Sequence, residues 1–211
     1  RWAVALDELE RRTGKLTVKR VHADMPNPFS GFSATTQFEI LGPLTTKIGN
    51  VAALPFLKGA SGYSDSHTIN GNSVVLKMTH GPWRFLFSGD LNEDAENVLL
   101  QRDPKAFEAE VFKVPHHGSA DFEDRFLAAV SPLVSIVSTG TTSELKEYLH
   151  PRANLMAALG AASRRTHPAR PIIFVTRLAG AFKYKGPSIR LKLDATSQPK
   201  LKAGKLVPDF D

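Results

Sequence analysis

The order of hydrophobic and polar positions along the chain predicts strands that alternate with helices. Residues 2–12 carry apolar side chains at helical spacing and are followed by Gly14, a typical helix stop. Further helices are predicted over residues 93–101, 122–130 and 154–163, and strands over residues 16–21, 36–41, 73–79, 83–88, 111–114, 133–138, 172–176 and 179–184. This alternation favours a layered α/β domain in which helices cover a mixed sheet.

Residues 44–71 differ from the rest of the chain because they show no clear periodicity. We predict a long loop there. Loops of that length inside a compact domain are uncommon unless they serve a site or are poorly ordered. The segment is therefore a candidate for gating a cleft or recognising a substrate, and the sequence does not favour one over the other.

The composition is typical of a globular protein, and 211 residues fit one ordinary domain. No apolar run approaches the roughly 18 residues that a membrane helix needs, and nothing near Arg1 resembles a signal peptide. The chain has no cysteine, which suits a cytoplasmic location and leaves His, Asp or Glu to hold any metal. Because the chain opens on Arg1 and not on methionine, we expect it to be a fragment.

The net charge of +6 is concentrated near the C-terminus. Residues 183–211 hold seven basic and three acidic side chains, which contributes +4 and leaves the remainder nearly neutral. We therefore divide the chain into a domain at residues 1–185 and a basic tail at residues 186–211. Such a tail either attracts nucleic acid or anionic surfaces through phosphate contacts, or is simply solvated.

Asp90 is the first residue with the pattern of a functional group. It follows the apolar residues 85–87 and a glycine, an arrangement that exposes a carboxylate at a turn. A carboxylate in that place can bridge two metal ions. Alternatively, Asp90 caps the helix that begins near Glu93.

Four histidines also lie at the ends of predicted elements. His116 and His117 follow the strand at residues 111–114, and neutral imidazole is the commonest metal ligand. Adjacent side chains diverge in strand-like geometry, so one of the pair would bind a metal while the other orients or contacts the substrate. His67 is either a metal ligand or an exposed loop residue, and His150 is either a proton donor in the cleft or a surface cap.

Four short segments carry a resemblance to a known family. They are residues 72–76 (NSVVL), 85–90 (FLFSGD), 112–119 (FKVPHHGS) and 150–151 (HP). In order and spacing they resemble the metallo-β-lactamase domain of the ComEC-type DNA-uptake proteins and their stand-alone relatives. The resemblance runs from about Ser66 to Lys183 and implies a metallo-β-lactamase-like αββα sandwich with mixed sheets.

The resemblance also implies a dinuclear site with two divalent metal ions, zinc or else manganese or iron. In this family Asp90 would be the bridging ligand, His116 the final ligand and His67 the middle histidine. Together with Asp90, His117 and His150 would be the catalytic groups that face the substrate.

One family element is missing from the sequence. No His-x-His-x-Asp-His cluster occurs anywhere in the chain, whereas family members carry it in the first half of the fold. We expect that this N-terminal part is supplied from upstream or by a partner chain; the alternative is a non-catalytic relative. Without it, the sheet would expose apolar surface and an unpaired edge.

These observations predict a metal-dependent hydrolase that uses a metal-bridged hydroxide on a phosphodiester or nucleic-acid substrate. Activity would depend on the upstream ligands. One alternative is a hydrolase of a thioester, lactone or β-lactam on the same site. Another is a metal-free binding or assembly module that uses the fold as a scaffold.

Overall fold

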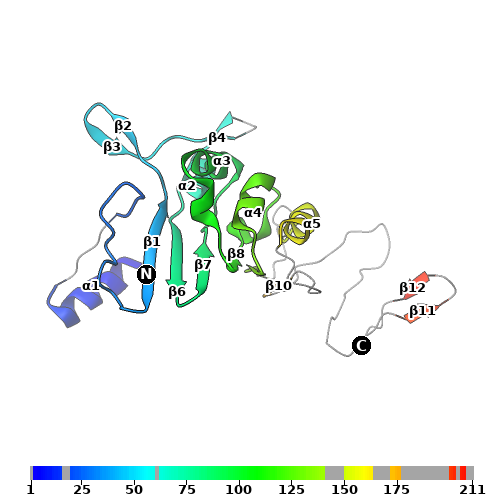
Figure 1. Ribbon diagram of the computed structural model, residues 1–211. Coiled ribbons are helices and arrows are strands. Elements are labelled where there is room, and N and C mark those ends of the chain that lie inside the picture. The colour runs from blue at the N-terminus through cyan, green and yellow to red at the C-terminus, as the bar shows by residue number, and fades with distance from the viewer. Residues whose placement is uncertain are drawn as a thin grey trace.

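The computed structural model of the protein (Figure 1) describes residues 2–15, 20–59, 62–140, 150–163, 172–176, 200–202 and 205–207. A six-stranded sheet forms its centre, in the order β1-β6-β7-β8-β9-β10. Its strands are β1 (Thr36–Gly42), β6 (Val75–His80), β7 (Trp83–Phe87), β8 (Val111–Lys113), β9 (Val134–Val137) and β10 (Ile172–Val175). The first three pair antiparallel and β7 to β10 pair parallel, which confirms the expected mixed sheet.

Helices lie along one side of this sheet, where α3, α4 and α5 follow one another (Figure 1). The helices are α1 (Trp2–Thr13), α2 (Asp65–Gly71), α3 (Glu93–Arg102), α4 (Asp124–Val130) and α5 (Ala153–Ala162). Two short 3₁₀ turns, η1 (Pro104–Phe107) and η2 (Pro115–Gly118), flank β8. Within the described ranges, every helix is too short or too polar to cross a bilayer.

The hydrophobic core lies between the sheet and these helices. Leu86, Phe112 and Val137 point into it from β7, β8 and β9, and none of them is exposed. The ring of Phe126 on α4 lies 6.3 Å from that of Phe112. Burial of each such side chain contributes about 1.5–3 kcal/mol, so this layer accounts for much of the stability of the domain.

The other face of the sheet, which we call the open face, is apolar and uncovered to a large extent. Strand register places fifteen side chains on it: Thr36, Phe38, Ile40, Leu76, Met78, His80, Trp83, Phe85, Phe87, Val111, Lys113, Val134, Ile136, Ile172 and Phe174. Twelve of them are apolar, yet none of the fifteen is buried. Phe87, Ile172 and Phe174 are 41%, 47% and 61% exposed.

Most predicted elements are confirmed, but the loop predicted over residues 44–71 is wrong. That segment forms two hairpins, β2 (Thr46–Ile48) with β3 (Val51–Ala53) and β4 (Lys58–Gly59) with β5 (Gly62–Tyr63), and then helix α2. Strands of two or three residues are too short to produce a recognisable alternation. Helix α4 also begins later than predicted, at Asp124, with Glu123 as its cap.

The C-terminal part of the chain is described only in pieces. The strand predicted at residues 179–184, and residues 16–19 of the strand predicted at 16–21, lie outside the described residues. Within the predicted tail, β11 (Lys200–Lys202) pairs antiparallel with β12 (Lys205–Val207), so part of the expected solvated tail is a hairpin. The boundary between residues 185 and 186 stays a prediction.

Candidate functional site

The turn that carries Asp90 has a fixed backbone shape. Gly89 has a φ of +56°, and a β-carbon there would lie 2.5 Å from Cβ of Ser73, so only glycine fits. The backbone N–H of Asp90 donates to Oγ of Ser73 at 2.9 Å. Helix α3 is capped by Asn92, whose side chain accepts from the N–H of Ala95. The suggestion that Asp90 caps this helix is therefore wrong, and its carboxylate is available for another role.

His117 faces this carboxylate from the end of the neighbouring strand. Its Nε2 lies 3.6 Å from Oδ1 of Asp90, and its Nδ1 lies 2.8 Å from the carbonyl oxygen of Ser138. The side chain is 51% exposed. Asp90 follows β7 and His117 follows β8, so the two residues meet because parallel strands end at the same edge of the sheet.

His116 has different surroundings from its neighbour. Its backbone N–H donates to the carbonyl oxygen of Gly89 at 3.2 Å, and Nδ2 of Asn70 lies 3.3 Å from its Nε2. Its Nδ1 is buried and has no hydrogen-bond partner among the described residues. Burial lowers the pKa of His116 from its ordinary value, against the raising effect of the Asp90 carboxylate, so the neutral imidazole is favoured.

Both histidines have backbone angles that are rare outside glycine. The φ angles are +47° at His116 and +53° at His117. A left-handed conformation at two successive bulky residues is strained and persists only where surrounding contacts hold it. Such strain is found most often at functional sites, although it does not identify the function.

His150 joins the group from the segment before α5. Its ring centroid lies 6.0 Å from that of His116, at an interplanar angle of 48°. Burial lowers the pKa of His150, and the nearby His116 and Arg152 act in the same direction. The structure therefore gathers Asp90, His116, His117 and His150 at one end of the sheet, as the positions at element ends had suggested.

His67 lies in the first turn of α2. Its Nε2 lies 2.8 Å from Oδ2 of Asp94, and its Nδ1 lies 3.6 Å from Oδ2 of Asp121. Both ring nitrogens thus face carboxylates on α3 and in the loop before α4. Its assignment as a metal ligand stays a prediction, and in this arrangement His67 instead links three elements.

Two further residues near the site were not found from the sequence. Lys113 is one of three polar side chains among the fifteen positions of the open face, with Thr36 and His80, and its Nζ donates to the carbonyl oxygen of Gly89 at 2.9 Å. Burial lowers its pKa, while the Asp90 carboxylate opposes that shift. A lysine inside an apolar strand was a usable signal for this residue. Asn70, which contacts His116, gave no such signal.

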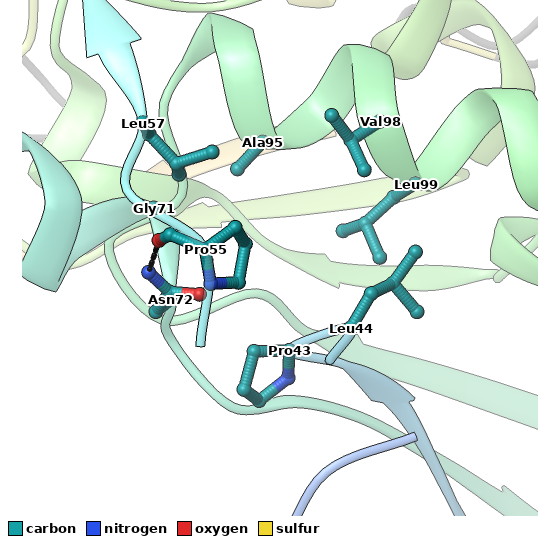
Figure 2. Close-up of a pocket in the computed structure, with 9 residues that line it drawn as sticks. All are labelled: Pro43, Leu44, Pro55, Leu57, Gly71, Asn72, Ala95, Val98 and Leu99. Atoms are coloured by element: carbon teal, nitrogen blue, oxygen red, sulfur yellow. Dashed lines mark hydrogen bonds between the residues drawn. The ribbon is translucent and has the colours of Figure 1, made fainter. Parts of the chain in front are cut away.

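A shallow apolar pocket lies elsewhere, beside α3 (Figure 2). Its lining consists of Pro43, Leu44, Pro55, Leu57, Gly71, Asn72, Ala95, Val98 and Leu99. The polar side chain in this set, Asn72, donates from Nδ2 to the carbonyl oxygen of Pro55 at 2.9 Å. Since no lining residue is titratable, the pocket offers apolar contact and no acid–base or metal chemistry.

Comparison with known proteins adds a partial similarity. The chain is similar to two competence proteins. It is 30% identical over 96 residues to ComE operon protein 3 of Bacillus subtilis, which is 45% of this chain and 12% of that protein. It is 32% identical over 98 residues to competence protein ComA of Neisseria gonorrhoeae, which is 46% of this chain and 14% of that protein.

The matched segment therefore spans only about an eighth of the length of these two relatives. No family model matches the chain, and no solved structure does. What is shown is a mixed α/β domain with a segment similar to competence proteins. Among the described residues, no three or more His, Asp or Glu side chains form a group that could hold a metal ion.

Proposed function

We propose that this chain is part of a metal-dependent hydrolase that acts on a phosphodiester or nucleic-acid substrate. The observation that carries the proposal is the pairing of Asp90 with His117 at the ends of two adjacent parallel strands, with 3.6 Å between Oδ1 and Nε2. Zinc binds carboxylate oxygen and imidazole nitrogen at about 2.0–2.2 Å, so two such ligands at a roughly tetrahedral angle lie about 3.3–3.6 Å apart. The spacing and the donor types therefore fit a divalent metal.

The residues of this chain would have separate tasks. Asp90 and a histidine of the 116–117 pair would hold the metal, and His150 would face the substrate as a proton donor. Two divalent ions, zinc or else manganese or iron, would supply a water nucleophile of lowered pKa and polarise the substrate. This pair gives too few ligands for a closed site, and we expect the remaining ligands from an N-terminal part or a partner chain.

The open face supports the finer fold assignment, a metallo-β-lactamase-like αββα sandwich. In that architecture two sheets pack face to face with helices outside, and the described sheet already has helices on one side only. Twelve apolar side chains on one face form a continuous surface, unlike the scattered hydrophobic residues of an ordinary protein surface. We propose that a second sheet, from an N-terminal part or a partner chain, covers it.

The choice of substrate class rests on the comparisons with other proteins. The resemblance to DNA-uptake proteins and the similarity to competence proteins favour a phosphodiester over a thioester, lactone or β-lactam. One observation favours a metal-free assembly module instead, namely that the described residues hold no group of three metal ligands. Metal content decides between these two classes.

The test measures bound metal and hydrolysis in the protein purified with all of its native upstream residues. We expect about two divalent ions per chain by mass spectrometry and hydrolysis of bis-p-nitrophenyl phosphate. Asp90→Asn should lower the metal content and reduce the rate by at least about 100-fold, because it removes a bridging charge. A wild-type protein without metal, or an Asp90→Asn variant with full activity, would overturn the proposal.

Asp124→Asn is the matched control. Asp124 is an exposed carboxylate in the first turn of α4, so the substitution makes the same change in charge away from the site. It should leave metal content and rate unchanged. Circular dichroism of both variants separates loss of the metal site from loss of the fold.

A further inference from the structure

Glu96 is a buried carboxyl group that the proposed site does not use. It lies on α3 and has no exposed surface. Its Oε2 accepts a hydrogen bond of 2.6 Å from the backbone N–H of Glu123, and its Oε1 is buried without a partner among the described residues. An ionised carboxylate away from water needs partners at both oxygens, so this single hydrogen bond leaves a negative charge on Glu96 poorly stabilised.

The charged groups that act on Glu96 make its ionisation still less favourable. They are Asp121 and Glu123, in the segment before α4, and Glu93, on α3 itself, and all three are carboxylates. Burial raises the pKa of Glu96 well above its ordinary value, the hydrogen bond from Glu123 opposes this shift, and the three charges add to it. The buried group is therefore favoured as the neutral acid.

The cationic side chains of α2 and α4 are engaged with other carboxylates. Nε of Arg125 on α4 lies 3.0 Å from Oε1 of Glu123, and Nε2 of His67 on α2 lies 2.8 Å from Oδ2 of Asp94. Neither side chain forms an ion pair with Glu96. Loss of the Glu96 proton would thus place an uncompensated charge in the interior, which is costly unless the surroundings rearrange.

The hydrogen bond to Glu96 anchors residues 119–123, which we call the linking segment, to α3. The linking segment begins directly after η2, and the N–H of Ser119 donates to the carbonyl oxygen of His116 at 2.9 Å. At the other end of the segment, the N–H of Glu123 reaches Glu96. The carboxyl group thus holds the stretch of chain that continues the strained turn of η2.

We infer that Glu96 is a pH-sensitive switch, which as the neutral acid holds the linking segment on α3 and on loss of its proton releases it. Because Glu96 has no exposed surface, its carboxylate gains water only when a neighbouring element moves. The linking segment has neither helical nor strand structure, so it opens at a lower cost than the helices around it. Release also removes support from the turn of η2. The switch is operated by a proton and does not depend on the proposed function.

Hydrogen exchange tests the switch without a measurement of activity. In the protein purified with its native upstream residues, exchange followed by mass spectrometry from pH 5 to 10 reports the protection of residues 119–123, after correction for the intrinsic effect of pH. We expect constant protection at low pH and a fall of about tenfold per pH unit above the folded pKa of Glu96, because each opening releases one proton. In Glu96→Gln, which has the same shape and cannot ionise, protection should not depend on pH.

Two controls separate local release from other effects. Residues 111–114 should keep their protection throughout, because the N–H of Val114 donates to the carbonyl oxygen of Ile136 at 2.9 Å within the central sheet. Glu39→Gln makes the same substitution at an exposed position on β1 and should follow the wild type.

Three results would overturn the inference. Constant protection of the linking segment in the wild type would mean that Glu96 stays neutral or ionises without opening. An equal fall in Glu96→Gln would assign the effect to another group, and an equal fall at residues 111–114 would indicate global unfolding. The wild-type profile is decisive by itself if the Gln variant does not fold.

Discussion

The two faces of the six-stranded sheet both carry large apolar side chains but have opposite surroundings. Toward the helices, Leu86, Phe112 and Val137 have no exposed surface. On the open face, Phe87 and Phe174 are 41% and 61% exposed. Yet Phe87 follows the buried Leu86 on β7, and Phe174 lies on β10, which pairs with the strand that carries Val137. The apolar residues of a strand match the layers that pack against its two faces. Such a layer can belong to the same chain or come from another one.

The largest expected effect that tests this comparison is Phe112→Ala. Phe112 is fully buried and packs against Phe126, so truncation should lower the free energy of unfolding by about 3–5 kcal/mol. Urea unfolding followed by circular dichroism measures the loss. A loss below about 1 kcal/mol would mean that the helix-covered face is not the core.

A second prediction concerns Glu96, which lies fully buried on the helix side. Its Oε2 accepts from the N–H of Glu123 at 2.6 Å. Burial raises its pKa well above the ordinary value, the hydrogen bond from Glu123 opposes this, and the charges of Asp121, Glu123 and Glu93 add to it. In the folded protein the neutral acid is therefore favoured.

The sign of the pH dependence follows from that shift. The folded state holds the proton of Glu96 more tightly than the unfolded state does. The stability that this difference contributes is complete below the unfolded pKa of Glu96 and is lost as pH rises toward its folded pKa. Glu96→Gln should remove this loss, so its advantage over wild type should grow by up to about 1.4 kcal/mol per pH unit above pH ~5. Unfolding at pH 5 to 9 measures it, and parallel curves for the two proteins would contradict it.

The smallest expected effect is that of Phe174→Ser on the open face. In this chain it should change the free energy of unfolding by less than about 0.5 kcal/mol, because the ring is mostly in water already. It should also reduce self-association, seen by analytical ultracentrifugation. If the protein with its upstream residues loses several kcal/mol on the same substitution, the second layer is present; an equal small effect in both would argue against it.

The sequence was a good guide to the elements that extend over several residues. Helical spacing in residues 93–101 and the hairpin pattern in residues 73–88 match α3, β6 and β7 closely. The hairpins in residues 44–63 were missed because their strands pair over two or three residues only. Pairing on that scale depends on turn geometry and on neighbouring segments, which a local pattern does not contain.

The sequence predicted part of the group of residues that lies at this end of the sheet, but not its geometry. Asp90, His116, His117 and His150 were expected from their places at element ends, and the structure brings them together. Which histidine faces Asp90 depends on two left-handed backbone conformations, and these are too rare in histidine to be expected from sequence. Likewise, the cap of α3 is Asn92 and not Asp90. Which residue caps a helix depends on where the helix begins to within one or two residues, and a sequence pattern does not fix that position.

The parallel pairing of β7 with β8 has a consequence for the order of events in folding. Asp90 and His117 are separated along the chain by α3 and η1, so they come together only after that crossover has folded back and β8 has docked beside β7. Contacts between residues distant in sequence form slowly because the chain must first lose the entropy of closing the loop. The pairing of carboxylate and imidazole therefore depends on that docking step, and a chain in which β8 has not yet docked lacks the two side chains that we propose to hold a metal ion.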